Sequence, residues 1–409
     1  MNLKFRLIIM NFLQYAIWGA WLISLGAYLG GNLKFDGFQI GSFFATMGIA
    51  SLFMPGIMGI IADRWIPAQK LLGICHILAA GFLIAAAPQT QYESLYPLIL
   101  CGVMFYMPTI SLSNSVAYNA LTKSGLNTIK AFPPIRVWGT VGFIVSMITV
   151  DLLGYANTAN QLYMSACIGF VLGLYAFTMP NCAVSVDHGR KSWVDQFGLR
   201  AFTLFKQSKM AIFFIFSMML GMSLQITNAF ANDYLTNFFG KNLAYQGTFG
   251  VEHANILISL SQASETLCIL LIPFFLKRFG IKKVMLISMI AWVLRFGLLG
   301  LGNPGGGVWM LILSMIVYGV AFDFFNISGS LFVENETNSS IRSSAQGVFM
   351  IMTNGFGAFI GSYVAGWVVD MTGWPNAWFV FAIYSMVVAI LFAIVFKHEH
   401  NPKDLEMVK

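Results

Sequence analysis

Apolar stretches long enough to cross a lipid bilayer follow one another along almost the whole chain, and they limit the fold more than any other feature. Of the 409 residues, 58% are hydrophobic and only 10% are charged, whereas a soluble domain carries roughly 25% charged residues. A spanning helix needs about 20 apolar residues. With short loops, the sequence therefore predicts an all-α membrane protein of twelve transmembrane helices, with no ordinary soluble domain left over.

The twelve apolar windows locate the expected helices to within a few residues. The first window is too long for the apolar region of a cleaved signal and lacks a clear small-residue cleavage site, so a spanning helix is expected there. The five cysteines are far apart and form no CxxC pair, so neither a disulfide framework nor a metal site is expected. The windows are 6–30, 38–62, 71–90, 95–119, 134–155, 160–180, 210–235, 253–276, 284–302, 307–331, 344–369 and 376–397.

The basic residues are distributed unevenly between the two sets of loops. Only Lys34 and Lys241 fall in loops that follow odd-numbered windows, and Arg136 and Arg295 lie within windows. The remaining Lys and Arg residues flank the other side of the membrane. Because Lys and Arg are enriched in cytoplasmic loops, both termini and the long 181–209 loop are expected in the cytoplasm. This asymmetry also explains the net charge of +7 better than binding to nucleic acid does.

The 181–209 loop divides the windows into six and six, and the two halves resemble each other weakly. Tyr106 and Asn114 recur as Tyr318 and Asn326, and Gly139-x-x-x-Phe143 recurs as Gly355-x-x-x-Phe359 at nearly the same offset. Duplicated halves are a common design of transporters. We therefore expect two pseudo-symmetric six-helix bundles, at 1–180 and 210–397, with a cytoplasmic linker at 181–209 and a cytoplasmic tail at 398–409.

Two carboxyl groups, Glu265 and Asp323, lie in the middle of apolar windows. A charge at mid-membrane costs about 3 kcal/mol or more, and intramembrane acids usually bind protons, ions or polar solutes. Asp323 stands among Phe322, Phe324 and Phe325, so it is a candidate proton carrier. The alternative is an acid that hydrogen-bonds a neighbouring helix. By themselves, these features predict a secondary transporter.

Several stretches resemble the bacterial nucleoside:H⁺ symporters of the major facilitator superfamily. Gly59–Arg64 looks like the loop motif of that superfamily, and Arg278–Lys283 resembles its degenerate second copy. The more specific stretches are Phe132–Thr140, Leu224–Asn228, Ser261–Glu265 and Tyr318–Ser330. The resemblance covers essentially the whole chain and implies nucleoside uptake driven by the proton gradient, with alternating access and no cofactor. A monomer in the bacterial inner membrane is the family expectation, with lipid, nucleoside and protons as partners.

The resemblance also implies a substrate site. Carboxylate and amide groups suit ribose hydroxyls or base edges, and aromatic rings can stack on a base. Each candidate has a plainer interpretation: Arg136 snorkelling to the interface, amides joining helices, and aromatic residues packing. The expected substrate-binding residues are Arg136, Thr140, Phe143, Gln225, Asn228, Gln262, Glu265, Tyr318 and Phe322, with Asp323 and Glu265 coupling the proton.

Other polar residues are given different roles. Asp63 and Arg64 are expected to form a conformational latch on the cytoplasmic face. His76 and Arg295 are interpreted as structural, because helices 3, 6, 9 and 12 of the major facilitator fold lie away from the substrate path. Glu334, Glu336 and Arg342 are expected in a solvated loop. Arg136 is expected just inside its helix, with Pro133 and Pro134 in the first turn.

Other classes of function fit less well. A proton symporter for another neutral polar solute, such as a sugar, is the nearest alternative, and a drug exporter would have fewer paired polar groups. No HExxH motif and no GxxxxGK[ST] loop occur in the sequence, which disfavours a zinc enzyme and an ATP-driven pump. A receptor without transport would not need two midplane acids or a duplicated fold.

Overall fold

The computed structural model describes residues 2–182, 199–338 and 341–398, and this part of the chain is helical, without a β-strand. By their contacts the residues form two compact units. Unit 1 is Met1–Phe35 with Thr46–Lys191, and unit 2 is Asp36–Ala45 with Ser192–Lys409. Most of the linker predicted at 181–209 and nearly all of the predicted tail lie outside the described residues.

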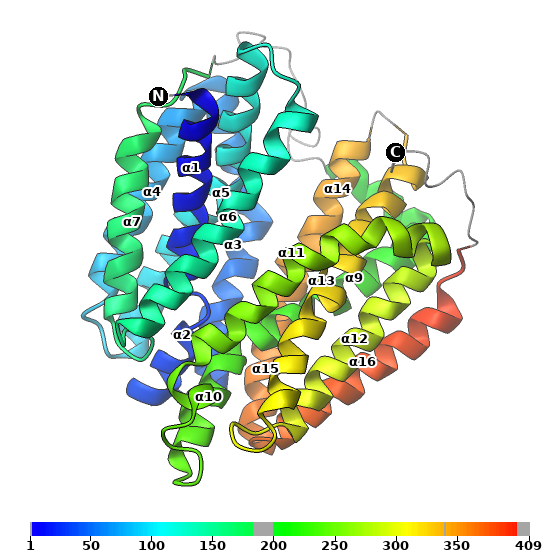
Figure 1. Ribbon diagram of the computed structural model, residues 1–409. Coiled ribbons are helices and arrows are strands. Elements are labelled where there is room, and N and C mark those ends of the chain that lie inside the picture. Colours follow the sequence, from blue (N-terminus) through cyan, green and yellow to red (C-terminus); the bar gives the residue numbers. More distant parts are fainter. Residues whose placement is uncertain (1, 183–198, 339–340, 399–409) are drawn as a thin grey trace. The chain divides into compact units, whose positions relative to one another are not determined.

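Unit 1 is built from long helices with short connections (Figure 1). Helix α1 packs on α6 and α7, and α4 packs on α5 and α7. The helices are α1 (Leu3–Gly19), α2 (Leu25–Ala27), the π-helix η1 (Tyr28–Asn32), α3 (Gly37–Arg64, whose first residues belong to unit 2), α4 (Ala68–Ala86), α5 (Tyr92–Lys123), α6 (Thr128–Leu152) and α7 (Asn160–Ala176).

Unit 2 repeats this kind of construction. Helix α9 packs on η5 and α15, α13 packs on α11 and α12, and α12 packs on α16. The elements are η2 (Leu199–Lys206), α9 (Ser208–Asp233), η3 (Tyr234–Phe238), η4 (Phe239–Lys241), α10 (Phe249–Glu252), α11 (Ala254–Phe279), α12 (Ile281–Leu301), α13 (Val308–Glu336), α14 (Arg342–Met350), η5 (Ile351–Gly357), α15 (Ala358–Thr372) and α16 (Asn376–Val395).

Ten helical segments in the described residues are long and apolar enough to cross a membrane. Helices α1 and α7, of 17 residues each, occupy the two remaining apolar windows. The sequence suggested one uninterrupted α-helix in the first window, but the structure shows an interruption there. After Gly19 the chain tightens, the Trp21 N–H donates to the Trp18 carbonyl oxygen, and the helical path resumes as α2 and η1.

Glycines allow the closest helix contacts in both units. In unit 1 a side chain at Gly142 would overlap the backbone of Phe12, and one at Gly19 would overlap the backbone of Phe143, so α1 and α6 touch backbone to backbone. In unit 2 a side chain at Gly221 would overlap the backbone of Thr353. Small residues permit such approach in membranes, where association depends on van der Waals packing.

The first turns of α3 are held by α15 within unit 2. The Asp370 carboxylate accepts hydrogen bonds from the backbone N–H groups of Gly37 (2.6 Å) and Phe38 (2.7 Å). These N–H groups have no partner within the helix, and a carboxylate there also complements the helix dipole. A side chain at Gly366 would overlap the Gly37 backbone, so glycines at both positions make the contact possible.

Candidate functional site

Five of the predicted site residues come together in unit 2, on the neighbouring helices α11 and α13. The Tyr318 and Phe322 rings are stacked, with centres 5.7 Å apart and planes 4° from parallel. Gln262 and Glu265 of α11 are polar neighbours of the Tyr318 side chain, and Glu265 is also near Asp323. The structure thus brings an amide, two carboxyl groups and an aromatic pair to one place.

The position of this cluster depends on a close approach of α11 and α13. A side chain at Gly319 would come within 2.6 Å of the Ser264 carbonyl oxygen. The Ser264 hydroxyl also donates to the Ile316 carbonyl oxygen. Because Glu265 follows Ser264 and Asp323 lies one turn after Gly319, this contact sets the two acids in register.

Asp323 is the most deeply buried acid of the cluster. Only 5% of its surface is exposed, and its Oδ2 atom is buried without a hydrogen-bond partner among the described residues. A buried polar group without a partner carries an energetic cost, and proteins keep such groups mainly at functional positions. The described structure shows no hydrogen bond from this Asp323 atom to a neighbouring helix.

The predicted amides of α9, Gln225 and Asn228, lie in unit 2 as well. Gln225 is buried, with 7% of its surface exposed, and its Oε1 atom has no partner in the described part of the chain. Asn228 is half-buried. The described structure therefore shows no helix–helix hydrogen bond at this oxygen.

In unit 1, Arg136, Thr140 and Phe143 lie along α6. The Arg136 guanidinium carbon lies 3.9 Å from the centre of the Tyr15 ring of α1. Arg136 and Thr140 are half-buried, and Phe143 is buried. The guanidinium is thus held over an aromatic face, a cation–π arrangement, and Tyr15 is a contact that the apolar pattern of α1 did not indicate.

The predicted start of this helix is wrong. α6 begins at Thr128, and Pro133 and Pro134 lie inside it rather than in its first turn. Proline cannot donate a backbone hydrogen bond, so the helix passes through both residues with two fewer donors. Arg136 consequently lies in the third turn of the helix.

His76 and Arg295, interpreted from the sequence as structural, have related surroundings. In unit 1, His76 Nε2 lies 2.8 Å from Gln14 Oε1, and its ring packs against Tyr106, with centres 6.0 Å apart. In unit 2 the Arg295 guanidinium carbon lies 4.6 Å from the centre of the Tyr318 ring. Arg295 therefore touches a predicted substrate residue, which its place on the ninth window did not reveal.

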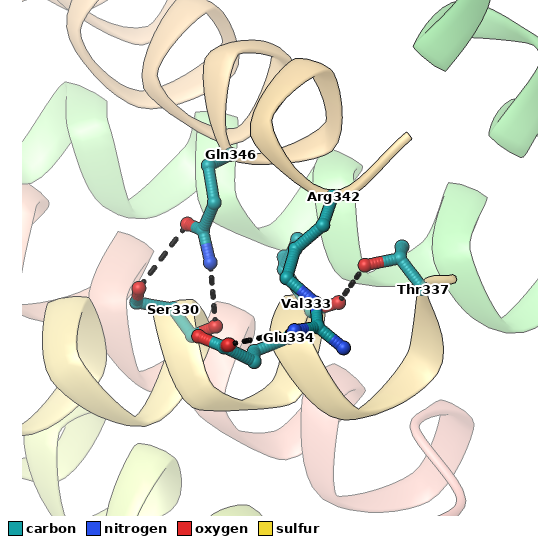
Figure 2. Close-up of polar contacts among 6 residues, drawn as sticks. All are labelled: Ser330, Val333, Glu334, Thr337, Arg342 and Gln346. Carbon is teal, nitrogen blue, oxygen red and sulfur yellow. Dashed lines mark hydrogen bonds and ion pairs between the residues drawn. The ribbon is translucent and has the colours of Figure 1, made fainter. Parts of the chain in front are cut away.

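The residues expected in a cytoplasmic loop are more ordered than predicted. Glu334 and Glu336 lie in the last turn of α13, and Arg342 begins α14. Arg342 Nη1 lies 3.2 Å from Glu334 Oε1, and Gln346 exchanges two hydrogen bonds with Ser330 (Figure 2). These contacts fasten α14 to the end of α13. Asp63 and Arg64, at the end of α3, are exposed.

A polytopic helical protein with a pair of acids, amides and stacked rings among its apolar helices has the features of a secondary transporter. Comparison with known proteins gives the family. The family model described as "Nucleoside H+ symporter" matches residues 1–401, and this chain belongs to that family.

The relatives and a solved structure agree with this membership. The nucleoside permease NupG of Escherichia coli is 49% identical, over 98% of this chain and 97% of the relative. The xanthosine permease of the same organism is also 49% identical, over 99% of each chain. The crystal structure of NupG has a TM-score of 0.92 and covers 98% of this chain and 100% of the other.

Proposed function

We propose that this chain imports nucleosides together with protons across the bacterial inner membrane by alternating access. The observation that carries the proposal is the cluster of α11 and α13, where Glu265 and Asp323 lie beside the stacked Tyr318 and Phe322 rings. A nucleoside combines a planar base with a hydroxyl-bearing sugar, so it needs both aromatic faces and polar acceptors. The family membership supports the same substrate class.

In this proposal the substrate-binding side chains are those predicted from the sequence on α6, α9, α11 and α13. Tyr318 and Phe322 stack on the base, and the amides and Glu265 hydrogen-bond its edge or the ribose. Arg136 offers a rigid fork of donors. The proposed set is Arg136, Thr140, Phe143, Gln225, Asn228, Gln262, Glu265, Tyr318 and Phe322. The buried Gln225 oxygen without a described partner supports its place in this set.

Asp323 is the proposed proton carrier, and Glu265 the proposed ligand-binding acid. Asp323 is the more buried of the two and has an oxygen without a described partner. Glu265 lies three residues after Gln262 on α11, and residues three apart share a helix face. Because the two acids lie close together, binding of substrate at Glu265 can influence the protonation of Asp323.

The proposed fold has twelve spanning helices in two pseudo-symmetric bundles, at 1–180 and 210–397. Two features support it. α1 and α7 fill the two windows beyond the ten long spans. Helix pairs at corresponding positions of the two halves are also in contact. The contacts of α1 with α6, of α4 with α5 and of α4 with α7 in the first half correspond, in this order, to those of α9 with η5, of α12 with α13 and of α12 with α16 in the second.

The remaining parts of the proposal follow from sequence distribution and family membership. Both termini face the cytoplasm, the protein is a monomer surrounded by lipid, and the proton gradient supplies the energy without a cofactor. Asp63 and Arg64 form the conformational latch, which their exposure at the end of α3 permits.

Uptake of radiolabelled uridine into cells tests the proposal. Cells that express the chain should accumulate uridine above its external concentration, and a protonophore should abolish the accumulation. Excess unlabelled nucleoside should compete, whereas excess sugar should not. Competition by a sugar would instead favour a symporter of another polar solute, and uptake indifferent to the protonophore would make the protein a facilitator.

A further inference from the structure

Arg295 is buried more completely than either acid of the cluster, yet none of the proposed binding or coupling roles uses it. Only 2% of its surface is exposed, and it lies on α12, a helix that contributes no residue to the proposed site. An unneutralised buried cation is expensive. A cation kept at this position therefore needs a specific explanation.

The guanidinium of Arg295 connects three helices. Its Nη1 atom donates to the Ser314 carbonyl oxygen of α13 at 2.8 Å and to the Ser261 hydroxyl of α11 at 3.4 Å. The Ser314 hydroxyl returns a hydrogen bond to the Arg295 carbonyl oxygen at 3.0 Å. Ser261 directly precedes Gln262, and Ser314 lies one turn before Tyr318. Arg295 is therefore bound one step away from the residues of the cluster on both helices.

The same guanidinium lies against the Tyr318 ring, with its carbon 4.6 Å from the ring centre. Trp292, one turn earlier on α12, meets Tyr318 edge to face, with centres 6.0 Å apart and planes at 90°. Phe322 is stacked with Tyr318, and Gln262 of α11 is a polar neighbour of the Tyr318 side chain. The Tyr318 ring is thus packed against Arg295, Trp292 and Phe322, and Arg295 is the cation among these three.

We propose that Arg295 is a positioning residue of the nucleoside site, which acts through Tyr318 by holding the ring in the orientation that stacks on the base. The inference rests on the proposed function, because Tyr318 must contact substrate for its orientation to matter. A desolvated cation–π pair is among the stronger contacts available to an aromatic ring. A planar guanidinium can make this contact while its edge still donates to Ser314 and Ser261.

The test compares three variants at matched expression in the membrane. Arg295→Met keeps an unbranched apolar side chain but removes the cation and its hydrogen bonds. Arg295→Lys keeps a cation that can lie over the ring but loses the planar fork. Tyr234→Phe is the control, because the Tyr234 hydroxyl donates to the Leu299 carbonyl oxygen of α12 at 3.2 Å, and neither residue belongs to the cluster of α11 and α13.

We expect Arg295→Met to raise the KM for uridine uptake by about 10-fold, in line with loss of a desolvated cation–π contact, while maximal uptake per transporter changes less than twofold. Arg295→Lys should give a KM between those of wild type and Arg295→Met. Tyr234→Phe should lower the melting temperature of the purified protein and leave the KM unchanged.

A merely structural role predicts a different order. A well-packed apolar residue often replaces a buried charge without loss, so Arg295→Met would then match or exceed Arg295→Lys, with changes only in yield or melting temperature. That result would overturn the inference. If Arg295→Met does not reach the membrane, Arg295→Gln replaces it, and a wild-type KM in Arg295→Gln would overturn the inference equally. Wild-type protein that transports no nucleoside would overturn the proposed function itself.

Discussion

The guanidinium carbon of Arg136 lies 3.9 Å from the centre of the Tyr15 ring, so the half-buried cation of α6 is held against the aromatic face of α1. Snorkelling would direct this side chain to the membrane surface, where either Lys or Arg would serve. Contact with a ring instead favours the planar guanidinium, which can stack on the ring and still present donors at its edge.

Arg136→Lys should therefore impair uridine uptake nearly as severely as Arg136→Ala, by about 10-fold or more. Lys preserves the positive charge, so expression and membrane insertion should survive. Uridine binding and uptake at matched expression measure the effect, and Tyr15→Leu should weaken binding in the same direction. Near-normal activity of Arg136→Lys would remove Arg136 from the site and leave Thr140 and Phe143 as the contribution of α6.

Neutral replacements of the two acids should separate their roles. Asp323→Asn should abolish accumulation of uridine against its gradient while counterflow exchange continues, because the substrate site survives without the proton carrier. Glu265→Gln should weaken uridine binding itself. The comparison uses counterflow in proteoliposomes and equilibrium binding to purified protein. Uphill transport retained by Asp323→Asn would exchange the two assignments.

Uptake should be electrogenic. A neutral nucleoside that enters with one proton carries one positive charge, and the membrane potential then contributes about 2.3 kcal/mol per 100 mV. Collapsing the potential with valinomycin and high external potassium at constant pH should slow accumulation. Equal accumulation with and without the potential, in vesicles that hold a constant pH gradient, would show that no net charge moves.

The contact at Gly366 gives a stability prediction within unit 2. Gly366→Ala would place a methyl group against the Gly37 backbone, so α15 and the start of α3 must separate and the hydrogen bonds to Asp370 weaken. Overpacking of this kind costs about 1–3 kcal/mol, and the melting temperature should fall by several degrees. The control is Gly297→Ala in α12, because a methyl group there would meet no atom within 4 Å. An equal melting temperature for both variants would contradict the predicted overlap.

Much of the architecture follows from the sequence alone. The apolar windows locate the helices because a bilayer requires long runs of apolar side chains whose backbone groups are satisfied within the helix. The window at 307–331, for example, corresponds to α13 at Val308–Glu336. Glu265 and Asp323 are visible as candidates for the same reason, since an acid in such a run is rare and costly.

The sequence leaves the helix ends and local interruptions open. Pro133 and Pro134 suggested a helix start, but α6 begins at Thr128, since proline is favoured in the first turn of a helix without being confined to it. The window at 344–369 similarly contains the π-helix η5 at Ile351–Gly357. Close backbone approach at Gly221 accompanies this change of helix geometry, and no periodicity in the sequence marks it.

Only the tertiary structure decides which of these residues meet. Hydropathy gives every polar residue within a window a similar appearance, and the family resemblance interprets Arg295 and His76 alike, as structural residues of helices away from the substrate path. The fold places Arg295 against Tyr318 and between α11 and α13, and it places His76 on Gln14.

The sequence by itself determined that the chain crosses a membrane many times and carries costly acids there. Packing of glycine-lined helix faces determined which side chains these polar residues contact. Contacts between residues distant in sequence depend on the rotation and register of the helices, and hydropathy does not encode either.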